Sequence, residues 1–286
     1  MKLKIKFKYI VCIFNHMRYF FLGLLAPYFC LAQLTLTTVK LPSELEETSG
    51  LEYLGEHLIT NNDSGDKPRL YVFTPQGELI KSIRFYNLKN RDWEDLAADE
   101  DHFYIADTGN NYATRENLRI YILGKDLIPQ GTIKIHYEAQ KTFSKESRNE
   151  YDAEALAVVG EDLVLFSKNR KTLQSQIYVF PKNEGNYSLI PEQTIDTKAL
   201  ISAADYNEKE DLVVLTGYDF EGKQYFFTLE DFKKNGMKNI DLTRYTIPVN
   251  PAQIEAVKII NKEEFWITSE SESKGKPRLF HLKLNL

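Results

Sequence analysis

Cysteine is nearly absent from this sequence. Of its 286 residues only Cys12 and Cys30 are cysteines, and both lie close to the N-terminus. The rest of the chain therefore has neither a disulfide framework nor a structural zinc site with cysteine ligands. A hydrophobic core must stabilise it instead, and the roughly 254 residues after position 32 are enough to build one.

Positive charge is also scarce once residues 1–32 are set aside. Five of the 36 Lys and Arg residues lie in this segment, together with none of the 41 Asp and Glu residues. Without it the chain carries a net charge of −10. Such a charge argues against nucleic acid or an anionic membrane surface as a partner. The sequence also lacks a Gly-x-Ser-x-Gly motif, which disfavours a serine esterase mechanism.

The segment 1–32 has the pattern of an export signal. Four lysines and Arg18 precede the apolar run YFFLGLLAPYFCLA, which ends in small residues suited to cleavage after Ala32. Asn15 and Arg18 interrupt the longer apolar stretch, so it is short for a membrane span. We therefore expect a secreted or periplasmic protein with no stable membrane span after cleavage. A retained anchor or a lipidated Cys30 stays open, as does translation from Met17.

A five-fold internal repeat follows. In each copy a Ser or Glu, here called the anchor, is followed by a small or acidic residue and an aliphatic strand. A second apolar strand and a third strand with an aromatic residue come next. The anchors are 45, 60, 48 and 53 residues apart, which matches the period of β-propeller blades. They are Ser49, Glu94, Glu154, Ser202 and Glu255.

The repeat predicts an all-β fold, a five-bladed β-propeller that occupies residues 33–286 as a single, monomeric domain. The segment QLTLTTVKL at 33–41 has no blade of its own, and the last repeat has only three strands. We expect the two to pair and close the ring, which removes an exposed sheet edge. A six-bladed alternative needs strands between Glu94 and Glu154, where 138–151 is too polar. Blade three is expected over 154–195, and a short helical connector near 229–236.

Propeller geometry places the five anchors together at one mouth of a central channel. Three glutamates converging there would repel one another unless a cation neutralises them. The five side chains offer only oxygen, which is the ligand type of Ca²⁺. None of the four histidines after residue 32 shares an anchor position. We predict a calcium site at the anchors; the alternative is that each anchor only hydrogen-bonds a neighbouring blade.

Polar loops between the second and third strands surround the same mouth. Asp63 and Asp107 lie in Asp-x-Gly turns of blades one and two, and Lys168 follows the corresponding strand of blade three. We predict that these three side chains form a catalytic rim, in which Lys168 replaces an aspartate of the other blades. Turn chemistry alone also explains the Asp-x-Gly pattern. Trp93, beside an anchor, is either an interblade packing residue or a stacking platform.

The strings ETSGLE, NDSG, DWEDLA, DTGNN and AEAL resemble those of the bacterial secreted phytase-esterase-like β-propeller family. The chain is also similar to the soluble calcium-activated nucleotidases, five-bladed propellers with Ca²⁺ in the central tunnel. This resemblance implies that Asp63 lies near a reacting phosphate. It also implies calcium ligands at Ser49, Glu94, Glu154, Ser202 and Glu255.

Two functions follow from these observations. One is a Ca²⁺-dependent hydrolase of phosphate or other esters that acts on a small anionic substrate. The other is a non-catalytic propeller of the cell envelope that binds a ligand or a protein. Because propellers host both classes, the fold does not decide between them.

Overall fold

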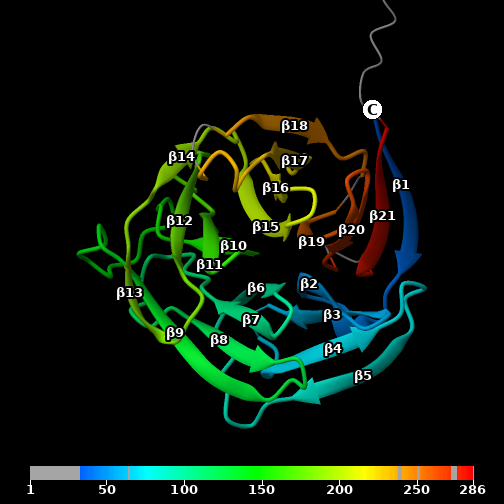
Figure 1. Ribbon diagram of the computed structural model, residues 1–286, viewed down its shortest axis with the longest axis horizontal. Coiled ribbons are helices and arrows are strands. Elements are labelled where there is room, and N and C mark those ends of the chain that lie inside the picture. The colour runs from blue at the N-terminus through cyan, green and yellow to red at the C-terminus, as the bar shows by residue number, and fades with distance from the viewer. Residues whose placement is uncertain (1–32, 64, 238–239, 250–251, 272–275, 286) are drawn as a thin grey trace, which may run out of the picture. The chain divides into compact units, whose positions relative to one another are not determined.

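The computed structural model describes residues 33–63, 65–237, 240–249, 252–271 and 276–285, so the predicted export signal lies outside the described residues. Five antiparallel blades surround a common centre, which confirms the predicted five-bladed β-propeller (Figure 1). The first strands lie nearest the centre: β2 (Thr48–Leu54), β6 (Trp93–Ala98), β10 (Ala153–Val159), β15 (Leu200–Asn207) and β19 (Ile254–Asn261).

The other strands follow outward in each blade. The second strands are β3 (His57–Asn62), β7 (His102–Asp107), β11 (Asp162–Ser167), β16 (Leu212–Tyr218) and β20 (Glu264–Ser269). The third strands are β4 (Arg69–Phe73), β8 (Arg119–Gly124), β12 (Ser175–Pro181), β17 (Gln224–Glu230) and β21 (Arg278–Asn285). The fourth strands are β5 (Leu79–Arg84), β9 (Pro129–Tyr137), β14 (Gln193–Ile195), β18 (Leu242–Thr246) and β1 (Gln33–Lys40).

Burial decreases from the centre to the edge of each blade, as the sequence pattern requires. The first and second strands are buried on both faces because neighbouring blades cover them, and they read as nearly continuous apolar runs. The outer strand β5 is half-buried or exposed along its length. Buried side chains of neighbouring blades therefore form the core between the sheets.

The N-terminal strand closes the ring as predicted. β1 pairs antiparallel with β21 over eight residues, from Gln33 opposite Asn285 to Lys40 opposite Arg278. Leu34 is 5% exposed and packs in the cluster that fills the space between blades four and five. The strand thereby gives the last blade its fourth member and covers the edge of β21.

Blade three departs from the expected four regular strands. β13 (Gly185–Leu189) leaves it and pairs parallel with β9 at the edge of blade two, so that sheet has five strands. The three-residue β14 then completes blade three against β12. Leu189 is buried in the cluster shared by blades two and three, and the ring of Tyr187 lies 6.0 Å from that of Phe180. Burial of these side chains explains the exchange.

The helical connector expected near 229–236 was wrong. Residues 231–237 form consecutive turns. The left-handed backbone of Asp231 (φ 52°) interrupts helical geometry there, and the side chain of Phe232 is buried. The sole helix of the described residues is the 3₁₀ turn η1 (Ser43–Leu45). No helix in that part of the chain is long and apolar enough to cross a membrane.

A β-bulge occurs near the anchor of every first strand. In four blades the anchor itself has no paired residue on the second strand, as for Glu94 between Trp93 and Asp95. In blade one the register shifts just after Ser49. A bulge re-aims the side chain of the extra residue. In blade one the bulge contains Gly50 (φ 67°), where a Cβ would lie 2.3 Å from the backbone nitrogen of Leu96. Glycine is thus required at this close contact between blades one and two.

Candidate functional site

The strand register defines a second set of equivalent positions beside the anchors. One residue at the end of each second strand pairs with the residue before the anchor, for instance Asp107 with Trp93 and Ser167 with Ala153. The next residue is the one that faces the anchors. Lys168 is therefore equivalent to Asp63 and Thr108, and not to Asp107, with which the sequence analysis grouped it. The full set is Asp63, Thr108, Lys168, Tyr218 and Glu270.

The two serine anchors connect neighbouring blades. Ser49 Oγ donates a hydrogen bond to the carbonyl of Glu94, and Ser202 Oγ donates to the carbonyl of Ile254 at 2.7 Å. Thr108 makes the corresponding contact to the carbonyl of Ala153 at 2.8 Å. These contacts match the alternative prediction, in which each anchor only hydrogen-bonds a neighbouring blade. Calcium ligation by the serines stays a prediction.

Two of the glutamate anchors share one internal cation. Lys168 Nζ forms an ion pair with Glu154 and lies 4.0 Å from Glu255 Oε1. Burial alone would lower the pKa of Lys168, but the carboxylates of Glu154 and Glu255 raise it well above its usual value. The lysine side chain is 4% exposed and also lies 4.9 Å from the centre of the Tyr218 ring. The predicted catalytic Lys168 therefore sits as a counterion within the mouth.

The third glutamate anchor has a different environment. Glu94 is 4% exposed, and its Oε1 has no hydrogen-bond partner among the described residues. Burial, and then the charges of Asp63 and Glu154, raise the pKa of Glu94 well above its usual value. Carboxylate oxygens surround it in two overlapping groups, Asp63–Asp92–Glu94 and Glu94–Asp152–Glu154, whose ligand atoms lie within 4.8 Å of one another.

Gly109 leaves room for this cluster. A Cβ at Gly109 would lie 2.0 Å from Glu94 Oε1 and 2.4 Å from Asp92 Oδ2, so any side chain here would displace both carboxylates. Arg115 holds the glycine in place, because its guanidinium donates to the carbonyl of Gly109 at 2.6 Å and to Asp107 Oδ1 at 2.8 Å.

Asp107 belongs to that support and not to the cluster. Its side chain is fully buried, pairs with Arg115 and accepts a hydrogen bond from the backbone N–H of Asp92 at 3.1 Å. Burial raises the pKa of Asp107, and the Arg115 guanidinium opposes that rise. These contacts give Asp107 a structural place. Its predicted catalytic role stays a prediction.

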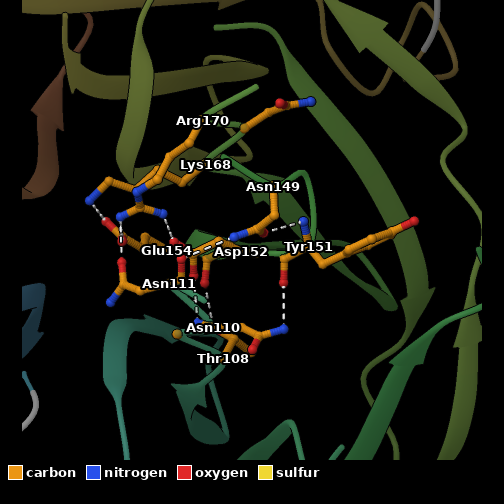
Figure 2. Close-up of polar contacts among 12 residues, drawn as sticks. Thr108, Asn110, Asn111, Asn149, Tyr151, Asp152, Glu154, Lys168 and Arg170 are labelled. Atoms are coloured by element: carbon orange, nitrogen blue, oxygen red, sulfur yellow. Dashed lines mark hydrogen bonds and ion pairs between the residues drawn. The ribbon is translucent and has the colours of Figure 1, made fainter. Parts of the chain in front are cut away.

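Arg170 neutralises the blade-three side of the cluster. Figure 2 shows its guanidinium among Asp152, Glu154 and Asn111, and it forms ion pairs with both carboxylates. Asp152 Oδ1 also accepts a hydrogen bond from the backbone N–H of Asn110 at 2.6 Å. The cations of the mouth thus lie beside Glu154 and Glu255, and Glu94 faces mainly other carboxylates.

Below the anchors a buried carboxylate contacts three blades. Asp95 is 1% exposed and accepts hydrogen bonds from the backbone N–H groups of Leu96, Leu156 and Ala204 at 2.8, 2.7 and 3.2 Å. One carboxylate therefore connects blades two, three and four. Burial raises its pKa well above the usual value, and these hydrogen bonds oppose that rise.

A buried triad follows toward the other end of the first strands. Lys258 Nζ lies 2.7 Å from Glu52 and 2.9 Å from Asp205, so one lysine joins blades one, four and five. Burial raises the pKa of Glu52 to about 7, and Lys258 opposes the rise. Each carboxylate of the triad has a cationic partner, in contrast to Glu94 at the mouth.

Sequence reasoning missed part of the cluster. It gave Asp92 and Asp152 no site role, and it did not single out Arg170. The available signal was the recurrence of Asp-x-Glu at 92–94 and 152–154 in adjacent blades. Trp93, between the first pair, is fully buried, and its ring lies 6.4 Å from that of Phe85, which follows β5 of blade one, so it packs between blades.

Fold and site together define a five-bladed β-propeller with a cluster of carboxylates at one mouth. A scan of family models finds no match to the sequence, and no curated protein matches it. Virginiamycin B lyase from Staphylococcus aureus is similar over 86% of this chain and 69% of its own, with 11% identity and a TM-score of 0.42. A Bacteroides fragilis protein described as exported is similar over 88% of this chain and 96% of its own, with 10% identity and a TM-score of 0.45. The WD40 repeats of RRP9 give 11% identity and a TM-score of 0.42 over 83% and 67%. Likenesses this distant carry no information on ligand or activity.

Proposed function

We propose that this chain is a secreted or periplasmic propeller that binds Ca²⁺ at the mouth, with Glu94 as the central ligand. The observation that carries the proposal is the buried Glu94 Oε1, which has no hydrogen-bond partner among the residues that the structure describes and lies within a cluster of carboxylates. Leaving a buried acceptor without a partner is costly, and leaving it beside other carboxylates is more so. A bound cation would remove both costs.

The residues present fit calcium. Ca²⁺ takes oxygen ligands at about 2.3–2.6 Å, so two ligands of one ion lie at most about 5 Å apart. The 4.8 Å limit within each group of carboxylates meets this condition. Asp63, Asp92 and Glu94 form the group farther from the cations, since Arg170 pairs with Asp152 and Glu154. We therefore assign the ion to Asp63, Asp92 and Glu94, with Asp152 and Glu154 alongside.

The chemistry that such a site supports is hydrolysis of a phosphate or another ester, in line with the resemblance found in the sequence. A bound divalent cation supplies Lewis acidity toward a substrate oxygen. Asp63 is half-buried at the rim, and we propose that it also acts as the base toward the attacking water. Lys168 and Arg170 hold Glu154 and Asp152 in position.

A thermal-unfolding experiment tests the calcium site. Ca²⁺ at 100 times its dissociation constant should stabilise the protein by about 2.7 kcal/mol relative to excess chelator. Glu94→Gln should abolish that stabilisation, and in chelator it should be at least as stable as the wild type, because the amide needs no proton to stay neutral among the carboxylates. Glu255→Gln, a matched change at an anchor outside both carboxylate groups, should retain the calcium response.

Two results would contradict this assignment: an unchanged unfolding midpoint of the wild type with Ca²⁺, or an equal response of Glu94→Gln. Hydrolysis is tested separately, in a screen of phosphate and carboxylate esters with Ca²⁺ and with chelator. An active ester should lose turnover in Asp63→Asn at a Ca²⁺ concentration that still stabilises this variant. If the calcium site is present and no ester is hydrolysed, the non-catalytic binding propeller replaces the hydrolase.

A further inference from the structure

The exposed aromatic side chains of the described residues lie at the end of the propeller that carries the mouth. In the described part of the chain, four large aromatic residues are exposed, and all lie on connectors at the end where the first strands begin. Exposed aliphatic residues at the opposite end include Ile80 and Ile128. The aromatic residues are Tyr86, Tyr112, Phe143 and Phe220, with 86%, 49%, 37% and 60% of their surface exposed.

A cationic side chain lies beside three of these rings. The Arg84 guanidinium lies 4.9 Å from the ring centre of Tyr86, and the Lys145 ammonium lies 4.3 Å from that of Tyr112. The Arg148 guanidinium lies 5.9 Å from the ring centre of Phe220. The same pair of an exposed ring and a cation thus recurs on blades one, two and four. We call these three pairs the aromatic–cation rim.

The connector between blades two and three holds much of this rim in place. Lys145 and Arg148 both belong to it. The backbone N–H of Glu146 donates to the carbonyl of Tyr112 at 2.9 Å, and the N–H of Arg170 donates to the carbonyl of Asn149 at 3.0 Å. The rim is therefore fixed beside the carboxylate cluster, because Arg170 also contacts Asp152.

We infer that the aromatic–cation rim binds an anionic polysaccharide, a chain of sugars that carry carboxylates. A pyranose ring presents a flat C–H face that packs on an aromatic ring, and its carboxylate pairs with a Lys or Arg beside that ring. A polyuronate repeats these two features at every sugar, as the rim repeats an aromatic ring and a cation. The inference rests only on the contacts of the aromatic–cation rim and goes beyond the proposed calcium-dependent hydrolysis.

Binding of short oligogalacturonates, measured by calorimetry in chelator, tests the inference without contribution from calcium. Tyr112→Ala and Phe220→Ala should each weaken binding about tenfold, the usual loss for an aromatic anchor of an interface. The chain offers controls of nearly equal exposure at the opposite end: Ile80→Ala at 49% and Ile128→Ala at 59% should bind like the wild type. Raising the salt concentration should also weaken binding, because exposed cations contribute to it.

Three results would overturn the inference: no binding of oligogalacturonate, equal binding by the rim variants and the wild type, or equal binding of neutral dextran. Tighter binding of polyglutamate than of oligogalacturonate would also overturn it, and would indicate an acidic protein as the partner. The rim variants should keep the calcium-dependent stabilisation of the wild type. Loss of sugar binding and absence of the calcium site are therefore separate results.

Discussion

The anchor position of the repeat has different electrostatic environments in different blades. Glu154 and Glu255 share Lys168, whereas one oxygen of Glu94 lies beside other carboxylates and has no partner in the described part of the chain. The difference arises from the neighbouring position at the end of the second strand, which is Lys168 in blade three and Thr108 in blade two. Lys168, together with Arg170 beside Glu154, thus decides which anchors have a cationic partner.

Glu270 provides a pH-dependent test at the scale of a residue. Burial, followed by the charges of Glu255 and Glu47, raises the pKa of Glu270 to about 10, whereas the unfolded chain has the ordinary value near 4.5. The folded state thus favours the protonated acid. This contribution to stability is complete below pH 4.5 and is lost as the pH rises toward 10.

Glu270→Gln should remove this loss, because the amide does not ionise. In chelator, the variant should gain stability relative to the wild type between pH 5 and pH 9, as measured by urea unfolding across that range. Glu221→Gln, an exposed substitution, serves as the control and should show no such trend. A constant difference between Glu270→Gln and the wild type at all pH values would contradict the assigned ionisation.

At the scale of elements, β1 contributes to stability by burial on one face only. Leu34 is 5% exposed, whereas its neighbour Thr35 is exposed. Leu34→Ala should therefore lower the free energy of unfolding by about 2–4 kcal/mol, and Thr35→Ala by less than about 0.5 kcal/mol. Denaturant unfolding of both variants measures the difference. Equal stabilities would show that β1 is not needed to close the ring.

The fold could be predicted at this scale because each blade repeats one local pattern. Anchor, small residue and apolar strands recur with the blade period, and the unpaired segment at 33–41 has one sheet edge available. The exchange of β13 could not be predicted, since Tyr187 and Leu189 suit blade two or blade three equally well. Only the packing of their side chains decides.

The candidate site was less predictable for a physical reason. Sequence spacing indicated which residues share the mouth, but bulges and strand register set which oxygens face each other. A shift of one residue separates Asp107 from the position of Asp63 and places it against Arg115. The pairing of Lys168 with Glu154 likewise depends on contacts in three dimensions.

At the scale of the whole molecule, the triad of Lys258, Glu52 and Asp205 joins blades that are distant in the sequence. Lys258→Met would leave two buried carboxylates without their cation, and should cost about 3–5 kcal/mol of stability. Adding Glu52→Gln and Asp205→Asn should restore much of the loss, because no uncompensated charge then remains. Urea unfolding compares the single and triple variants. A Lys258→Met protein as stable as the wild type would show that the triad does not stabilise the ring.

The strand exchanged between blades has a consequence for the ion. β13 extends the chain of blade three along the outer edge of blade two, while the carboxylates assigned to calcium come from these same two blades and blade one. The pairing of β13 with β9 thus links the two blades that carry Glu94 and Asp152. If this link holds the proposed calcium site in a fixed geometry, the site would resist contraction around a smaller cation. Its selectivity for Ca²⁺ over Mg²⁺, which demands ligands at about 2.0–2.1 Å, would then come from rigidity and not from charge.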